Sequence, residues 1–249
     1  MTLPDPIPAA TLIILRDSPS PGSPPELLMV KRAETMAFAG GAWVFPGGRV
    51  DPGDRALAVG LEAADVDGIA ARIAAIRETL EEVGLAIGID PPPGDATIAA
   101  MRTALHDGET IGAVLADHGL TIHPDLLVPY GRWRPSHQTT RVFDARFYVT
   151  SLPAEAPAAT VDSTENVALA WRDAEAMLAT ADVIFPTRRT LERLAQFSSV
   201  ASIVRDAAAY PVQTIVPWSE HRDGVEHICI PAGLGYPVTA EPLSSAMRG

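Results

Sequence analysis

The sequence predicts an α/β fold with a helical insertion, because short β-prone segments alternate with stretches of helical periodicity. Strands are expected at 9–15, 26–31, 43–45, 126–133, 141–150, 166–171 and, more weakly, 225–230. Helices are expected at 69–83, 95–105, 110–118, 173–178, 186–197 and 201–209. The helical insertion covers about 95–120, and C-terminal helices cover 186–209. Because the chain shows no internal repeat and no clear linker, residues 1–249 are expected to form a single domain.

The helix over 69–83 has the clearest pattern. Its apolar residues recur at helical spacing and therefore lie on one side, namely Ile69, Ile73, Ile76, Leu80 and Val83. Gly84 follows as a C-terminal stop, and Asp65 or Asp67 is suited to cap the start. We expect the apolar face of this helix to pack on the core.

Three glutamates occupy the opposite side of the same helix. Glu78, Glu81 and Glu82 stand at positions i, i+3 and i+4, which share a face, so this face is expected to present acid outward. A charged helix face is commonly just a solvated surface. Neighbouring carboxylates repel each other unless a cation lies between them, however, and Mg²⁺ is a hard cation that takes oxygen ligands. The spacing therefore suggests a helix that binds metal.

A glycine turn precedes this helix. Residues 43–54 read Trp-Val-Phe-Pro-Gly-Gly-Arg-Val-Asp-Pro-Gly-Asp, a short apolar strand followed by paired glycines that let a backbone approach a ligand closely. Here the chain resembles the Nudix hydrolase family. The signature of that family is a Gly, five residues, a Glu, seven residues and then Arg-Glu-apolar-x-Glu-Glu-x-Gly-apolar. Within 48–85 the matching residues are Gly48, Arg77, Glu78, Glu81, Glu82, Gly84 and Leu85.

The chain departs from this signature in three ways. Asp54 stands where the signature has Glu, and Thr79 stands where it has an apolar residue. Between Asp54 and Arg77 lie 22 residues in place of seven, which makes an insertion at about 55–70 that is expected to extend the helical region. The resemblance implies a Nudix fold, in which a mixed β-sheet is sandwiched between helices.

The resemblance also implies a chemistry, the hydrolysis of a diphosphate that links a nucleoside to another group, with Mg²⁺ or Mn²⁺ as cofactor. Glu78, Glu81 and Glu82 would be the metal ligands, with the backbone carbonyl of Gly48 as a further ligand. Arg77 would orient a glutamate through a charge-assisted hydrogen bond. Divalent ions suit this reaction because they neutralise the diphosphate and lower the pKa of water. Glu81, Glu82 and Arg77 are thus expected to be catalytic.

The general base is sought outside the acidic helix. Glu165 lies six residues before Trp171, and several Nudix enzymes have a glutamate in a comparable loop that acts as base or extra ligand. A loop carboxylate in water is an equally good interpretation, because a base requires a geometry that sequence does not give. The alternatives for the base are Asp144, Asp162 and His137.

Arginines near these segments are candidates for binding the phosphates of the substrate, because a guanidinium group pairs well with phosphate oxygens. The four residues are Arg32, Arg49, Arg141 and Arg146. Exposed charges on strands are an equally good interpretation of all four.

The order of flanking motifs over about residues 9–200 resembles a long Nudix subfamily that includes acyl-CoA diphosphatases. That resemblance implies CoA or acyl-CoA as substrate, with 3′,5′-ADP and (acyl-)phosphopantetheine as products. Arg134-Pro135 departs from the Thr-Pro of the subfamily, and a separate CoA-recognition motif is not evident. The alternative substrates are NADH, ADP-ribose, nucleotide sugars and dinucleoside polyphosphates. Two other functions of the same fold are a non-catalytic ligand sensor and, ranked lowest, an isoprenoid diphosphate isomerase.

Composition excludes some partners. The net charge is −12 and the pI about 4.8, which argues against general nucleic-acid binding and against docking on anionic membranes. Cys229 is the single cysteine, so no intrachain disulfide or Cys-rich zinc site is expected. Because the first residues lack signal-peptide character and no apolar run reaches the length of a membrane span, a cytoplasmic protein is expected. The family resemblance also makes a homodimer an expectation.

Overall fold

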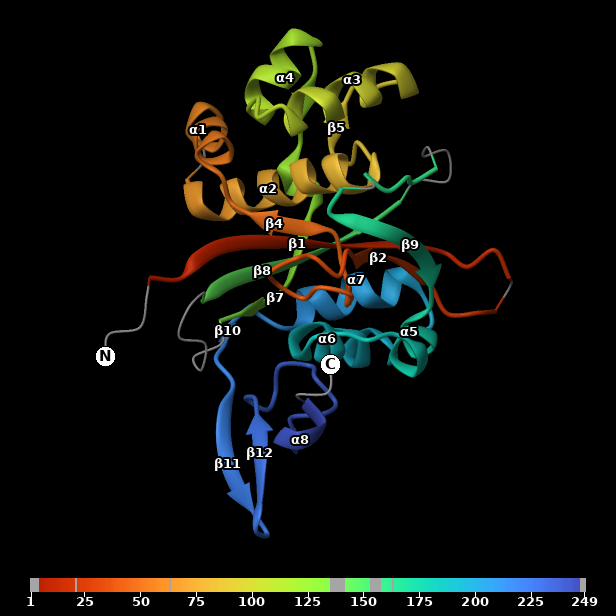
Figure 1. Ribbon diagram of the computed structural model, residues 1–249, viewed down its shortest axis with the longest axis vertical. Helices are drawn as coiled ribbons and strands as arrows, with labels where there is room; N and C mark the ends of the chain where they lie inside the picture. The colour runs from red at the N-terminus through yellow and green to blue at the C-terminus, as the bar shows by residue number, and fades with distance from the viewer. Residues whose placement is uncertain are drawn as a thin grey trace.

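The computed structural model describes residues 5–20, 22–62, 64–134, 142–152, 158–162 and 164–246. At its centre lies an eight-stranded mixed sheet (Figure 1). The sheet runs in the order β10 (Thr214–Ile215), β7 (Val128–Trp133), β8 (Phe143–Ser151), β1 (Ile7–Arg16), β2 (Glu26–Arg32) and β3 (Trp43–Val44). In addition, β4 (Gly47–Arg49) pairs with β1, and β9 (Asn166–Arg172) pairs with β2. The predicted α/β fold with a mixed sheet is confirmed.

Strand β1 lies in the interior of the sheet. It pairs in parallel with β8 and antiparallel with β2 and β4. Its sequence is apolar on both sides, as a strand covered on both faces requires. Leu12 and Ile14 pack into one hydrophobic cluster, whereas Ile13 and Leu15 pack into the other.

Helices cover both faces of the sheet. On one face lie α1 (Pro52–Gly60), α2 (Val66–Val83), α3 (Asp95–His106) and α4 (Ile111–Asp117), and on the other lie α5 (Ala174–Thr180), α6 (Phe185–Leu194) and α7 (Val200–Ala209) (Figure 1). The strands on either side of the α3–α4 segment, β5 (Ile89–Asp90) and β6 (Thr121–Ile122), pair with each other as a small two-stranded sheet. The predicted helices at 95–105 and 110–118 are confirmed as α3 and α4.

Helix α2 is the predicted acidic helix. Asp65 is its N-cap, since the Asp65 carboxylate accepts a hydrogen bond from the Gly68 amide at 2.9 Å. Gly84 ends it in the left-handed conformation with φ of 69°. The other proposed cap, Asp67, lies in the first turn and pairs with Arg55 of α1.

The insertion at about 55–70 extends the helical region, as its composition predicts, but it does not form one continuous helix. It forms the end of α1, a reversal through Leu61 and Glu62, and the first turns of α2. The φ of Glu62 is 54°, which takes the chain out of helical geometry and separates α1 from α2.

Several other predicted boundaries are shifted in the structure. The strand expected from residue 126 begins at Val128, because Pro124–Leu126 form the 3₁₀ helix η1 that Pro124 initiates. The helix expected to reach residue 197 ends at Leu194, where the Gln196 side chain turns back to donate to the Arg193 carbonyl.

The C-terminal segment forms a second, three-stranded sheet of β11 (Trp218–Arg222), β12 (Val225–Cys229) and β13 (Ala240–Pro242), followed by α8 (Leu243–Ala246). Strand β12 was predicted; β11 was not, because its polar sequence is exposed throughout and shows no alternation. The almost fully buried Arg189 of α6 ties this segment to the main body by an ion pair with Glu241 at 3.3 Å.

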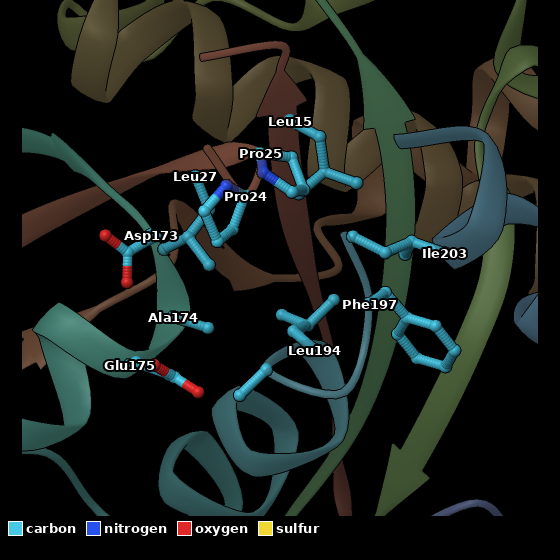
Figure 2. A pocket seen from close by; sticks show the side chains of 11 residues that line it. Leu15, Pro24, Pro25, Leu27, Asp173, Ala174, Glu175, Leu194, Phe197 and Ile203 are labelled. Atoms are coloured by element: carbon cyan, nitrogen blue, oxygen red, sulfur yellow. The ribbon is translucent and has the colours of Figure 1, made fainter. Parts of the chain in front are cut away.

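An apolar hollow opens on the face of the sheet away from α2 (Figure 2). Leu15, Leu27 and Leu194 line it, and all three belong to the hydrophobic cluster on the α5–α7 side. The acidic residues of α2 therefore lie on the opposite side of the sheet from this hollow. None of the helices in the described part of the chain combines the length and apolar character that crossing a membrane requires.

Candidate active site

The glycine turn allows β4 to lie close to both β1 and α2. Gly47 has φ of 155°, and a side chain there would overlap the backbone carbonyl of Ala10. A side chain at Gly48 would instead overlap the carboxylate of Glu78. Both glycines therefore permit a close approach, Gly47 to the backbone of the neighbouring strand and Gly48 to a side chain of the acidic helix.

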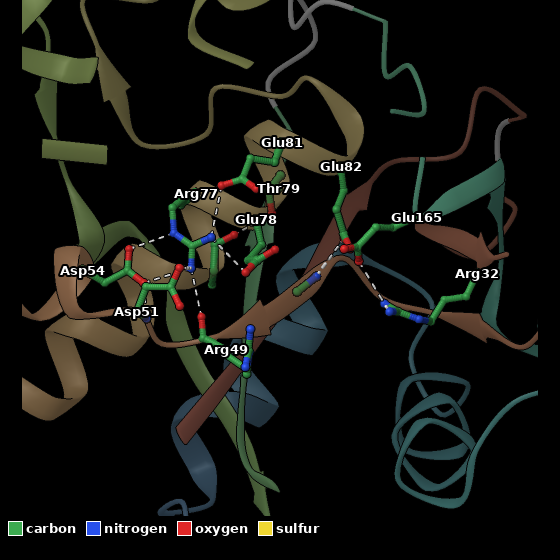
Figure 3. Close-up of polar contacts among 12 residues, drawn as sticks. Arg32, Arg49, Asp51, Asp54, Arg77, Glu78, Thr79, Glu81, Glu82 and Glu165 are labelled. Atoms are coloured by element: carbon green, nitrogen blue, oxygen red, sulfur yellow. Dashed lines mark hydrogen bonds and ion pairs between the residues drawn. The ribbon is translucent and has the colours of Figure 1, made fainter. Parts of the chain in front are cut away.

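Arg77 is the centre of the polar network that follows this turn (Figure 3). Its Nε and Nη2 donate to the two carboxylate oxygens of Asp54, each at 3.0 Å. Its Nη1 donates to Glu78 at 2.9 Å and to Glu81 at 3.1 Å, and its Nη2 also donates to the Arg49 carbonyl at 2.9 Å. Arg77 thus holds two of the three signature glutamates and the end of β4.

Asp54 keeps its connection to Arg77 despite the 22 residues between them. It is fully buried, and one of its oxygens also accepts a hydrogen bond from the Asp51 amide at 2.8 Å, which closes a capping box at the start of α1. The shorter carboxylate of Asp54 therefore anchors both α1 and Arg77. Thr79, the other departure, is buried in the core, and its hydroxyl donates to the Ala75 carbonyl at 2.7 Å.

Glu82 is held by the turn itself. Its Oε2 accepts a hydrogen bond from the Gly47 amide at 3.0 Å, and only 5% of the residue is exposed. Glu78 and Glu81 have side chains 17% and 18% exposed. The expectation of an acidic face that points outward is wrong, because β4 and Arg77 cover it.

Burial makes these carboxylates unusual acids. Desolvation, aided by the nearby charge of Glu81, raises the pKa of Glu78 to about 7, although Arg77 opposes the rise. Desolvation and the repulsion of Glu78 raise the pKa of Glu82 to about 8. Burial disfavours the charge of Arg77, but Asp54, Glu78 and Glu81 outweigh that effect and raise the pKa of its guanidinium above the ordinary value.

The comparisons with known proteins agree with this arrangement. The family model described as NUDIX domain matches residues 6–97, which run from β1 through the glycine turn and α2 to the start of α3. Residues 6–97 are therefore similar to a NUDIX domain. This match supports the resemblance to the Nudix family that the sequence motifs indicate, whereas a CoA-specific subfamily is a finer assignment.

A crystal structure of a NUDIX hydrolase from Alicyclobacillus acidocaldarius is similar over most of the chain. The two are 28% identical, with a TM-score of 0.71, and the match covers 82% of this chain and 97% of that one. Together with the NUDIX domain, this similarity supports a pyrophosphohydrolase.

Two further structures match less closely. One is a MutT protein from Methanosarcina mazei Go1, with 17% identity, a TM-score of 0.45 and coverage of 78% of this chain and 97% of that one. The other is the NUDIX domain of Shewanella oneidensis NrtR complexed with ADP ribose, with 11% identity, a TM-score of 0.45 and coverage of 77% and 86%. With TM-scores this low, the two add no weight to the assignment.

The carboxylate oxygens beside the glycine turn suit a hard divalent cation. The buried carboxylate of Glu82 and the largely buried carboxylate of Glu78 repel each other, and a bound cation would relieve that repulsion. Within the residues that the structure describes, no three carboxylate, His or Cys side chains already converge as a metal cluster. In this arrangement Arg77 supplies the compensating charge to Glu78 and Glu81.

Glu165 lies near the site but is not buried. Its side chain is 57% exposed, and its Oε2 lies 3.5 Å from Nη2 of Arg32, which has a side chain only 13% exposed (Figure 3). The charge of Arg32 also reaches Glu82 and opposes part of the rise in the pKa of that residue. The structure thus brings together Arg32, Glu82 and Glu165 from β2, α2 and the loop before β9.

The other candidates for the base have different contacts. Asp144 forms a two-bond ion pair with Arg132 at 2.7 and 2.6 Å, and this pairing lowers the pKa of Asp144. The Asp162 carboxylate accepts hydrogen bonds from the amides of Glu165 and Asn166 at 3.0 and 3.1 Å, and therefore shapes the loop that carries Glu165. His137 lies outside the described residues.

Of the remaining arginines, Arg49 is exposed at the end of β4, beside the site. Arg146 of β8 is in register with Ala10 of β1, which pairs with Gly48, and its charge acts on Asp67, Tyr148 and Asp144. Arg141 lies outside the described residues.

Three features of the site escaped the sequence analysis. The Gly47 amide donates to Glu82, which the paired glycines could have suggested. The side chain of the fully buried Asn166 lies close enough to Glu82 to oppose the rise in the pKa of that carboxyl group, yet within the described part of the chain its side-chain amide atoms have no hydrogen-bond partner. Arg102 of α3 donates a hydrogen bond to a carbonyl at the end of α2. Because Arg102 lies far from these residues in the sequence, no sequence pattern indicated this contact.

Proposed function

We propose that the chain is a hydrolase, dependent on Mg²⁺ or Mn²⁺, that cleaves the diphosphate of a nucleoside-diphosphate-linked compound, with CoA or acyl-CoA as the preferred substrate. The observation that carries the reaction class is that Arg77 holds Glu78 and Glu81 while the amide of Gly47, in the glycine turn, holds Glu82. The preference for CoA follows from the order of flanking sequence motifs and gives 3′,5′-ADP and (acyl-)phosphopantetheine.

The residues of the chain divide the work as follows. Glu78, Glu81 and Glu82 would hold the divalent ion, with the Gly48 carbonyl as an additional ligand. The ion, when bound, supplies charge neutralisation to the diphosphate. Arg77 fixes Glu78 and Glu81, and the Gly47 amide fixes Glu82, so the ligands keep their positions.

Glu165 would accept the proton of the attacking water. Its exposure leaves its carboxylate accessible, and Arg32 restrains it at 3.5 Å. Arg32 and Arg49, which lie beside the site in the described part of the chain, would meet phosphate oxygens, and Arg141 and Arg146 stay candidates for the same role.

A substrate panel tests the proposal. The purified protein is incubated with Mg²⁺ or Mn²⁺ and with CoA, acyl-CoA esters, NADH, ADP-ribose, nucleotide sugars or dinucleoside polyphosphates, and the products are separated by chromatography. We expect the fastest turnover with CoA compounds and none with EDTA. Turnover of NADH or ADP-ribose without CoA would refute the substrate but keep the reaction class, and no turnover at all would favour a ligand sensor.

A further inference from the structure

The C-terminal end of α2 is unusually complete in its hydrogen bonding. The last four carbonyls of a helix lack partners within the helix. Here the Leu80 carbonyl accepts from the Gly84 amide at 3.0 Å, the Glu82 carbonyl from the Asp162 amide at 3.1 Å and the Val83 carbonyl from the Thr160 amide at 2.9 Å. The carbonyl of Glu81 is left to a side chain.

That side chain is Arg102, which belongs to α3 in the helical insertion. Its Nε and Nη2 donate to the Glu81 carbonyl at 3.0 and 2.9 Å, and Nη2 also approaches the Glu82 carbonyl at 3.4 Å. A cation at this end of a helix also interacts favourably with the helix dipole. Arg102 therefore restrains the turn of α2 that carries two of the proposed metal ligands.

Arg102 also holds the loop that leads to Glu165. Its Nη1 donates to the Thr160 hydroxyl at 2.9 Å, and its Nη2 donates to the Thr160 carbonyl at 3.2 Å. Two residues further along, the Asp162 carboxylate accepts from the Glu165 amide. A single guanidinium group thus bonds both to the helix of the metal ligands and to the loop of the proposed base.

We infer that Arg102 is a positioning residue for the site. Through Arg102, the α3–α4 insertion holds α2 in a fixed position relative to the loop that carries Glu165. This inference rests on the proposed metal-dependent function. Arg102 does not touch the reacting groups; it acts through the backbone of Glu81 and Glu82 and through Thr160. Partners of this indirect kind commonly change metal affinity by about 10-fold or more.

The test compares Arg102→Ala and Arg102→Lys with a matched control, Arg72→Ala. Arg72 lies on α2 itself and also donates to a backbone carbonyl, that of Leu127 at 3.2 Å, but at the other end of the helix. Affinity for Mn²⁺ is measured by calorimetry on each full-length protein. Hydrogen exchange at residues 80–84 and 160–166 is measured without metal.

We expect Arg102→Ala to weaken Mn²⁺ binding about 10-fold and to speed exchange in both segments, whereas Arg72→Ala changes neither. Arg102→Lys should recover part of the affinity, because a lysine keeps the charge but not the several bonds. If Arg102→Ala does not fold, Thr160→Val, which removes one acceptor of Arg102, carries the same comparison with a smaller effect.

Two results would overturn the inference in distinguishable ways. Parental Mn²⁺ affinity and parental exchange in Arg102→Ala would refute the role of Arg102 alone. A parent protein that binds no Mn²⁺ would overturn both this inference and the proposed function.

Discussion

Arg77 shows how one residue organises the site. Its guanidinium group is almost fully buried and makes bonds to Asp54, Glu78, Glu81 and the Arg49 carbonyl. A lysine has a single ammonium group and could not bond to all of these acceptors at once. The network therefore depends on the planar fork of arginine, in addition to its charge.

The two glycines of the turn should fail in different ways when changed. In Gly48→Ala the new methyl group meets only the end of the Glu78 side chain, which can rotate away. In Gly47→Ala the methyl group meets the Ala10 carbonyl, and φ of 155° is strained for alanine. We expect Gly48→Ala to fold with weakened Mn²⁺ binding, and Gly47→Ala to lose roughly 1–3 kcal/mol of unfolding free energy.

Calorimetry with Mn²⁺ and urea unfolding of both variants check this contrast. Equal losses of stability in the two proteins would show that the turn is constrained in another way.

The raised pKa of Glu82 predicts a dependence of stability on pH. In the metal-free folded protein this pKa is about 8, whereas its ordinary value is 4.5. Between these two pH values the folded state therefore binds more protons than the unfolded state. Stability must then fall as pH rises, with no loss below about pH 4.5 and the full loss above about pH 8. Glu82→Gln removes this titration.

Urea unfolding at pH 5 and pH 9 in EDTA measures the effect. The free energy of unfolding of the parent, relative to that of Glu82→Gln, should decrease between the two pH values. Glu109→Gln, at an exposed residue outside the site, should show no such change relative to the parent. A parent that gains stability relative to Glu82→Gln would contradict the burial of a protonated carboxyl group.

At the scale of elements, periodicity and end signals predicted α2 well. Asp65 and Gly84 mark its ends in the structure as in the sequence. The boundary between α1 and α2 was not predictable, because alanine- and leucine-rich residues favour helix on both sides of the reversal at Glu62. Short strands such as β4 were missed because three residues carry no periodic signal.

The N-cap of α2 offers a test of this local account. Asp65→Ala removes the acceptor of the Gly68 amide and should cost about 1 kcal/mol of unfolding free energy. Asp67→Ala removes only an exposed pair with Arg55 and should cost at most about 0.5 kcal/mol. Urea unfolding at constant pH compares them; an equal or larger loss in Asp67→Ala would show that the exposed pair, and not the cap, fixes the start of the helix.

At the scale of the whole molecule, the sequence identified the carboxylates but not how the fold brings them together. The spacing of Glu78, Glu81 and Glu82 placed them on one helix face. Three contacts belong to the tertiary structure. Strand β4 covers this face, Asp54 reaches Arg77 across an enlarged connection, and Arg102 comes from an insertion. Each depends on sheet pairing and helix packing between residues far apart in the chain.

The layered fold also explains the position of the site. Helix α2 packs its apolar side on the sheet while its glutamates meet the β4 turn at the edge of that contact. The α5–α7 layer and the C-terminal sheet belong to the opposite side and supply none of the described site residues. The expected homodimer stays a prediction.

The central claim is that the glutamates at the Gly47–Gly48 turn bind a divalent ion. A titration with Mn²⁺, followed by the loss of the free-ion signal in electron paramagnetic resonance, tests it on the parent, on Glu82→Gln and on the exposed control Glu109→Gln. We predict saturable binding to the parent and to Glu109→Gln, and strongly weakened binding to Glu82→Gln. Equal binding by all three proteins, or no binding by the parent, would contradict the account.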